Sequence, residues 1–172
     1  MTDMFSSKAK YRPTLLDRLA DNDSRRSDET DTLRQISAEE MKDSVARDLE
    51  ALLNSRCPMN EQLYRQYPES LNSICSYGMG DFIGRSLANP SDRNHICRSL
   101  ERTIAIHERR LKQVRIALEL DSRATNRLRF TIHALLILHP SMEPVHFDAL
   151  LHPATLNYSV SRPMRPAAMP AV

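Results

Sequence analysis

Apolar residues recur at intervals of three and four residues after residue 37, and this spacing predicts an amphipathic helix. Its start, Ser37-Ala38-Glu39-Glu40, matches the capping box, in which a serine and a glutamate each satisfy a free amide of the first turn. The apolar stripe consists of Met41, Val45, Leu49, Leu52 and Leu53. Because a proline disfavours helical backbone in the residue before it, Pro58 places the helix end near residues 54–56.

A second helix with the same spacing is predicted to start at residues 89–92, with Ser91 as its N-cap. Its apolar face consists of Ile96, Leu100, Ile104 and Leu111. Between the two helices, residues 57–76 are expected to be irregular, with one helical turn around residues 71–74. Residues 76–82 contain two of the three glycines and are expected to form a turn-rich connection.

The hydrophobic period changes from 3.6 to 2 at Val114, which predicts a half-buried strand over residues 114–120. A second alternation covers residues 127–139, and it becomes apolar on both faces at residues 134–138, where cover on both sides is expected. Shorter strands are predicted at residues 145–147 and 156–160. Helices followed by consecutive strands are typical of an α+β fold, here two main helices packed on an antiparallel meander of three to four strands.

The ordered domain is therefore expected over residues 37–161, with flexible or disordered segments at residues 1–36 and 162–172. Within the N-terminal segment, residues 13–20 predict a short helix, and its apolar residues are Leu15, Leu16 and Leu19. A short apolar helix on a charged, flexible linker is typical of a docking peptide. The alternative is that this helix folds back onto its own domain.

Arginine outnumbers lysine twenty to four, although the formal net charge is only +2. Residues 98–129 carry nine basic residues against four acidic ones. Such a segment could contact phosphates, or it could contact another protein, because guanidinium groups pair with carboxylates and tolerate burial. The low net charge and the total of nine aromatic residues argue against a nucleic-acid partner. Contact with a protein is the favoured interpretation.

The sequence predicts neither a membrane-inserting segment nor a disulfide framework. The three cysteines are odd in number and 18 and 22 residues apart, a spacing that fits neither disulfides nor a zinc knuckle. The longest apolar run is residues 134–138, far too short to insert in a membrane, and no signal peptide is predicted. A soluble cytoplasmic protein is expected.

Catalytic and metal-binding patterns are also missing from the sequence. Glu143 and His146 form Glu-x-x-His, but Pro144 prevents the helix on which such ligands share a face. No nucleophile lies in a G-x-S-x-G context, and the carboxylates lie among arginines, where ion pairing is expected. The sequence thus predicts no catalytic residue, no metal ligand and no cofactor, and the protein is expected not to be an enzyme.

Five segments together carry a family resemblance. They are residues 14–19 (TLLDRL), 48–56 (DLEALLNSR), 76–82 (SYGMGDF), 107–111 (HERRL) and 145–148 (VHFD). In order and spacing these segments resemble the TssE family of bacterial type VI secretion baseplate subunits and their relatives in the baseplate wedges of contractile-tailed phages. The resemblance spans residues 13–160.

A Glu-Pro-Arg motif at the junction of the last helix and the first strand is typical of that family. Here Glu108 and Arg110 match the motif, and Arg109 replaces the proline. The resemblance implies a charge-paired interface at Glu108 and Arg110, to which Arg109 adds a positive charge. Leu15, Leu16 and Leu19 remain a second candidate docking site, on the grounds given above. Without the proline, the helix end must be fixed by the change to a strand pattern and by packing.

The resemblance also implies a structural role in the wedge, with TssF and TssG as direct partners and TssK as an indirect one. Such subunits are thought to seed the TssB/TssC sheath by strand exchange, and part of the long strand at residues 127–139 could pair with a sheath segment unless the third strand covers it. Two alternatives remain: an arginine-rich nucleic-acid-binding module, and an anti-adaptor regulator built on the same fold.

Overall fold

The computed structural model describes residues 11–19, 35–57, 61–80, 89–120, 128–152, 155 and 157–162. The chain divides into two compact units, Met1–Val45 and Ala46–Val172, and the boundary falls inside helix α2 (Ala38–Asn54). Most of the linker predicted at residues 21–36 and most of the tail predicted at residues 162–172 lie outside the described residues.

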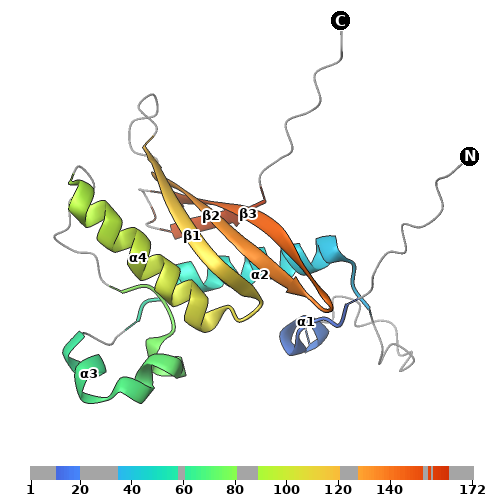
Figure 1. Ribbon diagram of the computed structural model, residues 1–172, viewed down its shortest axis with the longest axis horizontal. Helices are drawn as coiled ribbons and strands as arrows, with labels where there is room; N and C mark the ends of the chain where they lie inside the picture. Colours follow the sequence, from blue (N-terminus) through green and yellow to red (C-terminus); the bar gives the residue numbers. More distant parts are fainter. Residues whose placement is uncertain are drawn as a thin grey trace, which may run out of the picture. The chain divides into compact units, whose positions relative to one another are not determined.

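The second unit contains a four-stranded antiparallel sheet in the order β1-β2-β3-β4, as Figure 1 shows for β1 to β3. The strands are β1 (Leu111–Leu120), β2 (Leu128–Leu138), β3 (Ser141–His152) and β4 (Asn157–Ser161). Because every strand pairs with the next one in sequence, the sheet is a meander. The expected α+β fold is confirmed.

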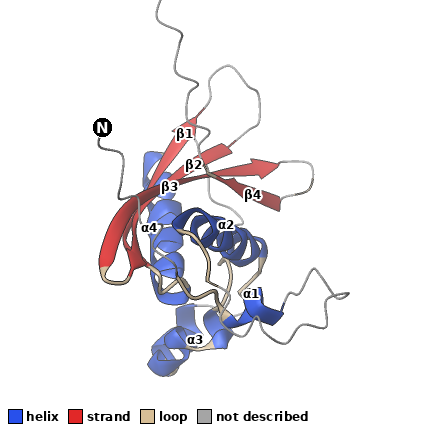
Figure 2. Cartoon of the chain, turned by 90° about the vertical axis from the view of Figure 1, so that its right-hand side faces the viewer, coloured by secondary structure: helices blue, strands red, loops and turns tan. Residues whose placement is uncertain are grey.

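Helices cover one face of this sheet. Figure 2 shows α4 (Pro90–His107) and the part of α2 from Ala46 onward on the same side of the strands. The core of this unit is formed by side chains that are at most 2% exposed, among them Leu49, Leu52, Leu53, Leu100, Ile104, Phe130, Ile132, Leu136 and Phe147. Phe130, Ile132, Ala134, Leu136 and Leu138 alternate along β2 with half-buried and exposed residues, as the period of two predicts.

The assignment of Leu111 to the apolar face of the second helix is wrong. The helix ends at His107, and Leu111 is the first residue of β1. The expected N-cap is also wrong, because the side chain of Asn89, not that of Ser91, accepts the first-turn amide, from Ser91 N at 2.9 Å. Gln113 has a positive φ of 52°, and the register of β1 shifts between Lys112 and Arg115.

This irregularity explains why the strand pattern was visible only from Val114. Leu111 and Val114 are both buried although they are three residues apart, because the bulge returns the side chains to the same face. The regular alternation resumes only after it.

Two other segments differ from the expectation. Residues 61–66, expected to be irregular, form α3 (Glu61–Gln66), and 3-10 turns follow at Pro68–Asn72 and Ile74–Ser76. Most side chains of α3 are exposed, so this helix carries no apolar stripe that a sequence could reveal.

The strand β3 is longer than the segment expected at residues 145–147. It begins directly after the turn at His139 and Pro140 and includes Pro144, which pairs with Leu135 of β2. Since β4 pairs only with residues Asp148 to His152 of β3, Pro144 lies where β3 has a single neighbouring strand and its missing N–H costs no ladder bond.

Candidate functional site at the junction of α4 and β1

Glu108 caps the C-terminus of α4 and shapes the turn into β1. Its N–H donates to the carbonyl of Ile104 at 2.8 Å, and its carbonyl accepts from Leu111 N at 3.1 Å. The Glu108 carboxylate accepts from both the main-chain N (3.1 Å) and the Nε (2.8 Å) of Arg110. The carboxylate therefore fixes the helix end that a proline would otherwise fix, although packing and the strand pattern were the devices expected.

Arg110 joins this turn to α2 through a charge network. Its Nη2 donates to both Glu108 and Asp48, a residue of α2. Burial disfavours the charged guanidinium, but the hydrogen bonds and charges of Glu108 and Asp48 outweigh it and raise the pKa of Arg110. Glu108 is only 7% exposed, and the positive charge of Arg110 compensates its buried carboxylate. The network locks α2, α4 and β1 together.

Residues 76–80 pack against the same junction. His107 Nε2 lies 3.1 Å from Ser76 Oγ and 3.0 Å from its carbonyl oxygen. The ring of Tyr77 contacts His107 edge to face at 5.4 Å, and burial, followed by the charges of Asp48 and Glu108, raises the pKa of Tyr77. The polar groups at the end of α4 are thus held by a segment that was expected only to be a connection.

This segment is tied to the end of α2 by backbone hydrogen bonds. Met79 N donates to the Ser55 carbonyl at 2.8 Å, and Cys57 N donates to the Met79 carbonyl at 2.9 Å. Gly78 has φ of 108°, and a Cβ there would lie 2.7 Å from Ser55 O. The backbones approach so closely that only glycine fits.

The structure thus divides the three residues predicted at the junction. Glu108 and Arg110 face each other and Asp48, whereas Arg109, between them, is exposed. Asp48 was not among the predicted site residues. Its place in the segment DLEALLNSR carries no sign of a partner 62 residues away, so only the structure reveals the pair.

The second predicted docking site lies in the first unit. Helix α1 (Leu15–Leu19) exposes 68% of Leu15 and 72% of Leu16, while Asp17 accepts a hydrogen bond from the buried Ser44 at 2.6 Å. Leu19 is the last residue of α1, and the surroundings of its side chain lie outside the described part of the chain. The helix is therefore held by a polar contact, and its two described leucines remain uncovered.

Helix side chains close parts of both sheet edges, which the sequence did not indicate. Glu101 of α4 accepts from Ile116 N of β1 at 2.9 Å. On the opposite edge, Asn54 of α2 pairs with Tyr158 of β4, and Glu50 accepts from Val160 N at 2.8 Å. These side chains bond backbone groups that a neighbouring strand would otherwise pair with.

The described histidines lie apart from any metal-binding cluster. His133 and His146 face each other across β2 and β3 with 2.7 Å between their Nδ1 atoms, and both are exposed. Within the described ranges, no group of three or more His, Cys, Asp or Glu residues could hold a metal ion.

No helix among the described residues is both long and apolar enough to cross a bilayer.

These features define a class of protein: a small α+β domain whose helix–strand junction is braced by a buried ion-pair network. The model of the family "Baseplate wedge protein gp25" matches residues 39–141, more than half of the chain. The chain belongs to this family of baseplate wedge proteins. No curated protein sequence matches the chain.

One solved structure is similar to the chain: "The baseplate complex from the type VI secretion system". The alignment has 14% sequence identity and a TM-score of 0.43, and it covers 66% of this chain and 96% of the other.

Proposed function

We propose that this protein is a structural subunit of the baseplate wedge of a bacterial type VI secretion system, which acts by binding and not by chemistry. In this role it works on the cytoplasmic side of the machine, binds TssF and TssG, connects through them to TssK, and seeds the TssB/TssC sheath. The observation that carries the proposal is the family match, because residues 39–141 include α4, all of α2 after its first residue, and the junction that the network braces. The choice of secretion system rests on the sequence resemblance.

The exposed part of the junction is Arg109. Glu108 and Arg110 are engaged with each other and with Asp48, so their contribution to an interface is to hold the turn in one conformation. Arg109 lies between two braced residues, so the backbone of the turn is already ordered when the Arg109 guanidinium forms a planar, two-point pair with a partner carboxylate. In this proposal Arg109 contacts TssF or TssG, and Glu108 and Arg110 position it.

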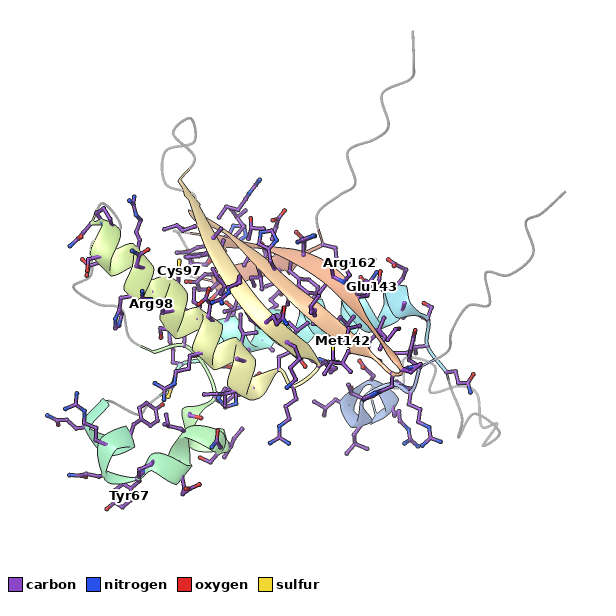
Figure 3. All side chains as sticks on the ribbon, in the orientation of Figure 1. Tyr67, Cys97, Arg98, Met142, Glu143 and Arg162 are labelled. Atoms are coloured by element: carbon purple, nitrogen blue, oxygen red, sulfur yellow. The ribbon has the colours of Figure 1, made fainter. Side chains whose placement is uncertain are left out.

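Co-purification with TssF and TssG tests the assignment. The chain would be co-expressed with tagged TssF and TssG, as wild type and as Arg109→Glu. Reversing an exposed charge leaves the fold intact but places like charges together at the interface, so the amount retained should fall at least about tenfold. Arg98→Glu is the matched control, because Arg98 is an exposed arginine on α4 (Figure 3).

Two outcomes would count against the proposal in different ways. If the wild-type chain does not co-purify with TssF or TssG, the wedge assignment fails. If wild type and Arg109→Glu are retained equally, the wedge assignment stands but Arg109 is not at the interface.

A further inference from the structure

Two histidines face each other across the two central strands of the sheet. His133 of β2 is in direct register with His146 of β3, and both side chains are exposed. Their Nδ1 atoms are 2.7 Å apart, and the two rings meet edge to face with their centroids 4.6 Å apart. The two residues are 13 positions apart in sequence, which matches no metal-ligand motif, so it is the strand register that brings them together.

The strands hold these two side chains in place. His133 follows the buried Ile132, and His146 precedes the buried Phe147. Because side chains alternate across a sheet, both histidines lie on the face opposite the one that α4 covers (Figure 2). β2 is paired with β1 on one side and with β3 on the other, and the pairing with β3 is continuous over residues 128–138. The backbone of the pair is therefore ordered before any ligand arrives.

Two convergent imidazole nitrogens form a chelating pair for a divalent transition-metal ion. Imidazole suits Zn²⁺, Cu²⁺ and Ni²⁺, whereas Mg²⁺ and Ca²⁺ prefer oxygen ligands. Two nitrogens bound to one such ion, each at about 2.0–2.1 Å, lie about 2.9–3.4 Å apart at square-planar to tetrahedral angles. The observed 2.7 Å between the Nδ1 atoms reaches this range after small rotations of the two exposed rings. Each neutral imidazole can carry its proton on Nε2, which leaves both Nδ1 lone pairs to the ion.

The charged residues near the pair favour a cation. Asp148 is two residues after His146 on the same face, about 7 Å along the strand, and accepts a hydrogen bond from Thr131 Oγ1 at 3.4 Å. Arg115 is in register with His133 on the other side, but it is exposed and its long stem lets the guanidinium turn into solvent. Asp148 is half-buried and short, so its negative charge stays near the pair.

We infer that His133 and His146 form a binding site for a divalent transition-metal ion, which joins β2 to β3 through the two Nδ1 atoms. Among the described residues, no third His, Cys, Asp or Glu completes a group with them, so water fills the remaining coordination positions. The inference does not depend on the proposed function, because it rests on these two rings and not on the junction of α4 and β1.

Calorimetric titration of the purified, tag-free full-length chain with Ni²⁺ tests the site. His133→Gln and His146→Gln should each bind the ion at least about tenfold more weakly than wild type, because the loss of one ring turns a chelate into a single ligand. His95→Gln is the matched control, since His95 is an exposed histidine on α4, and its affinity should equal that of wild type. All three substitutions are at exposed positions, and circular dichroism verifies that each variant is folded.

Thermal unfolding gives an independent readout. Saturating Ni²⁺ should raise the unfolding temperature of wild type and of His95→Gln by at least about 3 °C, because the ion binds the folded chain, and should leave the two pair variants unchanged. Mg²⁺ should shift none of the four proteins.

Three results would overturn the inference. The first is a wild-type chain that does not bind Ni²⁺. The second is equal affinity of wild type and the two pair variants, which would place the ion elsewhere on the chain. The third is a loss of affinity in His95→Gln as large as in His133→Gln, which would show that any exposed histidine contributes equally.

Discussion

At the scale of single residues, the main result is that one arginine of the junction is structural and its neighbour is exposed. Arg110 pairs with a carboxylate that is 7% exposed and with Asp48 of another helix, whereas Arg109 meets solvent. A guanidinium can do this because it donates in several directions from one plane. Two adjacent, identical residues therefore have different roles, and only their surroundings distinguish them.

Removing the Arg110 side-chain charge should destabilise the protein strongly. Arg110→Met keeps an apolar stem but removes the guanidinium and leaves the buried Glu108 carboxylate without its partner, so the free energy of unfolding should fall by about 3 kcal/mol. The unfolding free energy of Arg110→Lys should lie between those of Arg110→Met and wild type, because an ammonium cannot bond both carboxylates in the same geometry. Urea unfolding at pH 7, followed by circular dichroism, measures these differences.

The matched control for this prediction is Arg109→Met, which changes the same residue type one position away. Because Arg109 is exposed, the unfolding free energy of the Arg109→Met variant should remain within about 0.5 kcal/mol of wild type. A loss for Arg110→Met as small as that of the control would show that the network does not brace the fold.

At the scale of elements, the close approach of residues 76–80 to the end of α2 gives a second prediction. Gly78→Ala must accommodate both a φ of 108° and a Cβ 2.7 Å from the Ser55 carbonyl oxygen. The bonds between Met79 and both Ser55 and Cys57 should weaken as a result, and the unfolding free energy should fall by at least about 2 kcal/mol.

Gly80 provides the comparison for Gly78. A Cβ at Gly80 would have no atom within 4 Å and its φ is not positive, so Gly80→Ala should be tolerated or slightly stabilising. Thermal unfolding of the two variants side by side measures the difference. Equal unfolding temperatures would mean that the two segments can separate without cost.

The elements that the sequence predicted well are those in which one face is buried along a regular period. The apolar stripe of α2 and the alternation along β2 correspond to buried side chains in the structure. The prediction failed where the periodicity breaks, at the bulge around Gln113, or where it is absent, at the exposed helix α3. A hydrophobic period in the sequence arises only where one face of an element is buried. An element without a buried face therefore shows no such period.

The candidate site was predictable only in part, for a related reason. Glu108 and Arg110 could be located through the family motif, but their partner Asp48 is 62 residues away in sequence. The caps formed by Asn54, Glu50 and Glu101 could not be located at all, because a polar residue on a helix is compatible with solvent exposure as well as with a bond to a strand edge. Polar pairs between residues that are distant in sequence can be identified only from the folded structure.

At the scale of the whole molecule, the chain offers features for contact in each of its two units. The second unit contains the exposed Arg109, and the first contains α1, which lies outside the residues matched by the family model. Two contact regions on one chain increase the affinity for a shared assembly beyond that of either alone, provided that both can be engaged together. A near-neutral net charge fits this role better than it fits a polyanion binder.

The leucines of α1 provide the test of a second contact region. Because Leu15 and Leu16 are 68% and 72% exposed, the double variant Leu15→Ser and Leu16→Ser should leave the unfolding free energy unchanged. If a wedge partner buries them, the same variant should lower retention by TssF and TssG at least about tenfold, since each buried leucine contributes about 1.5–3 kcal/mol. Tyr67→Ser is the control, because Tyr67 is 63% exposed and lies in the other unit (Figure 3). Undiminished retention of the double variant would mean that α1 docks on no wedge partner.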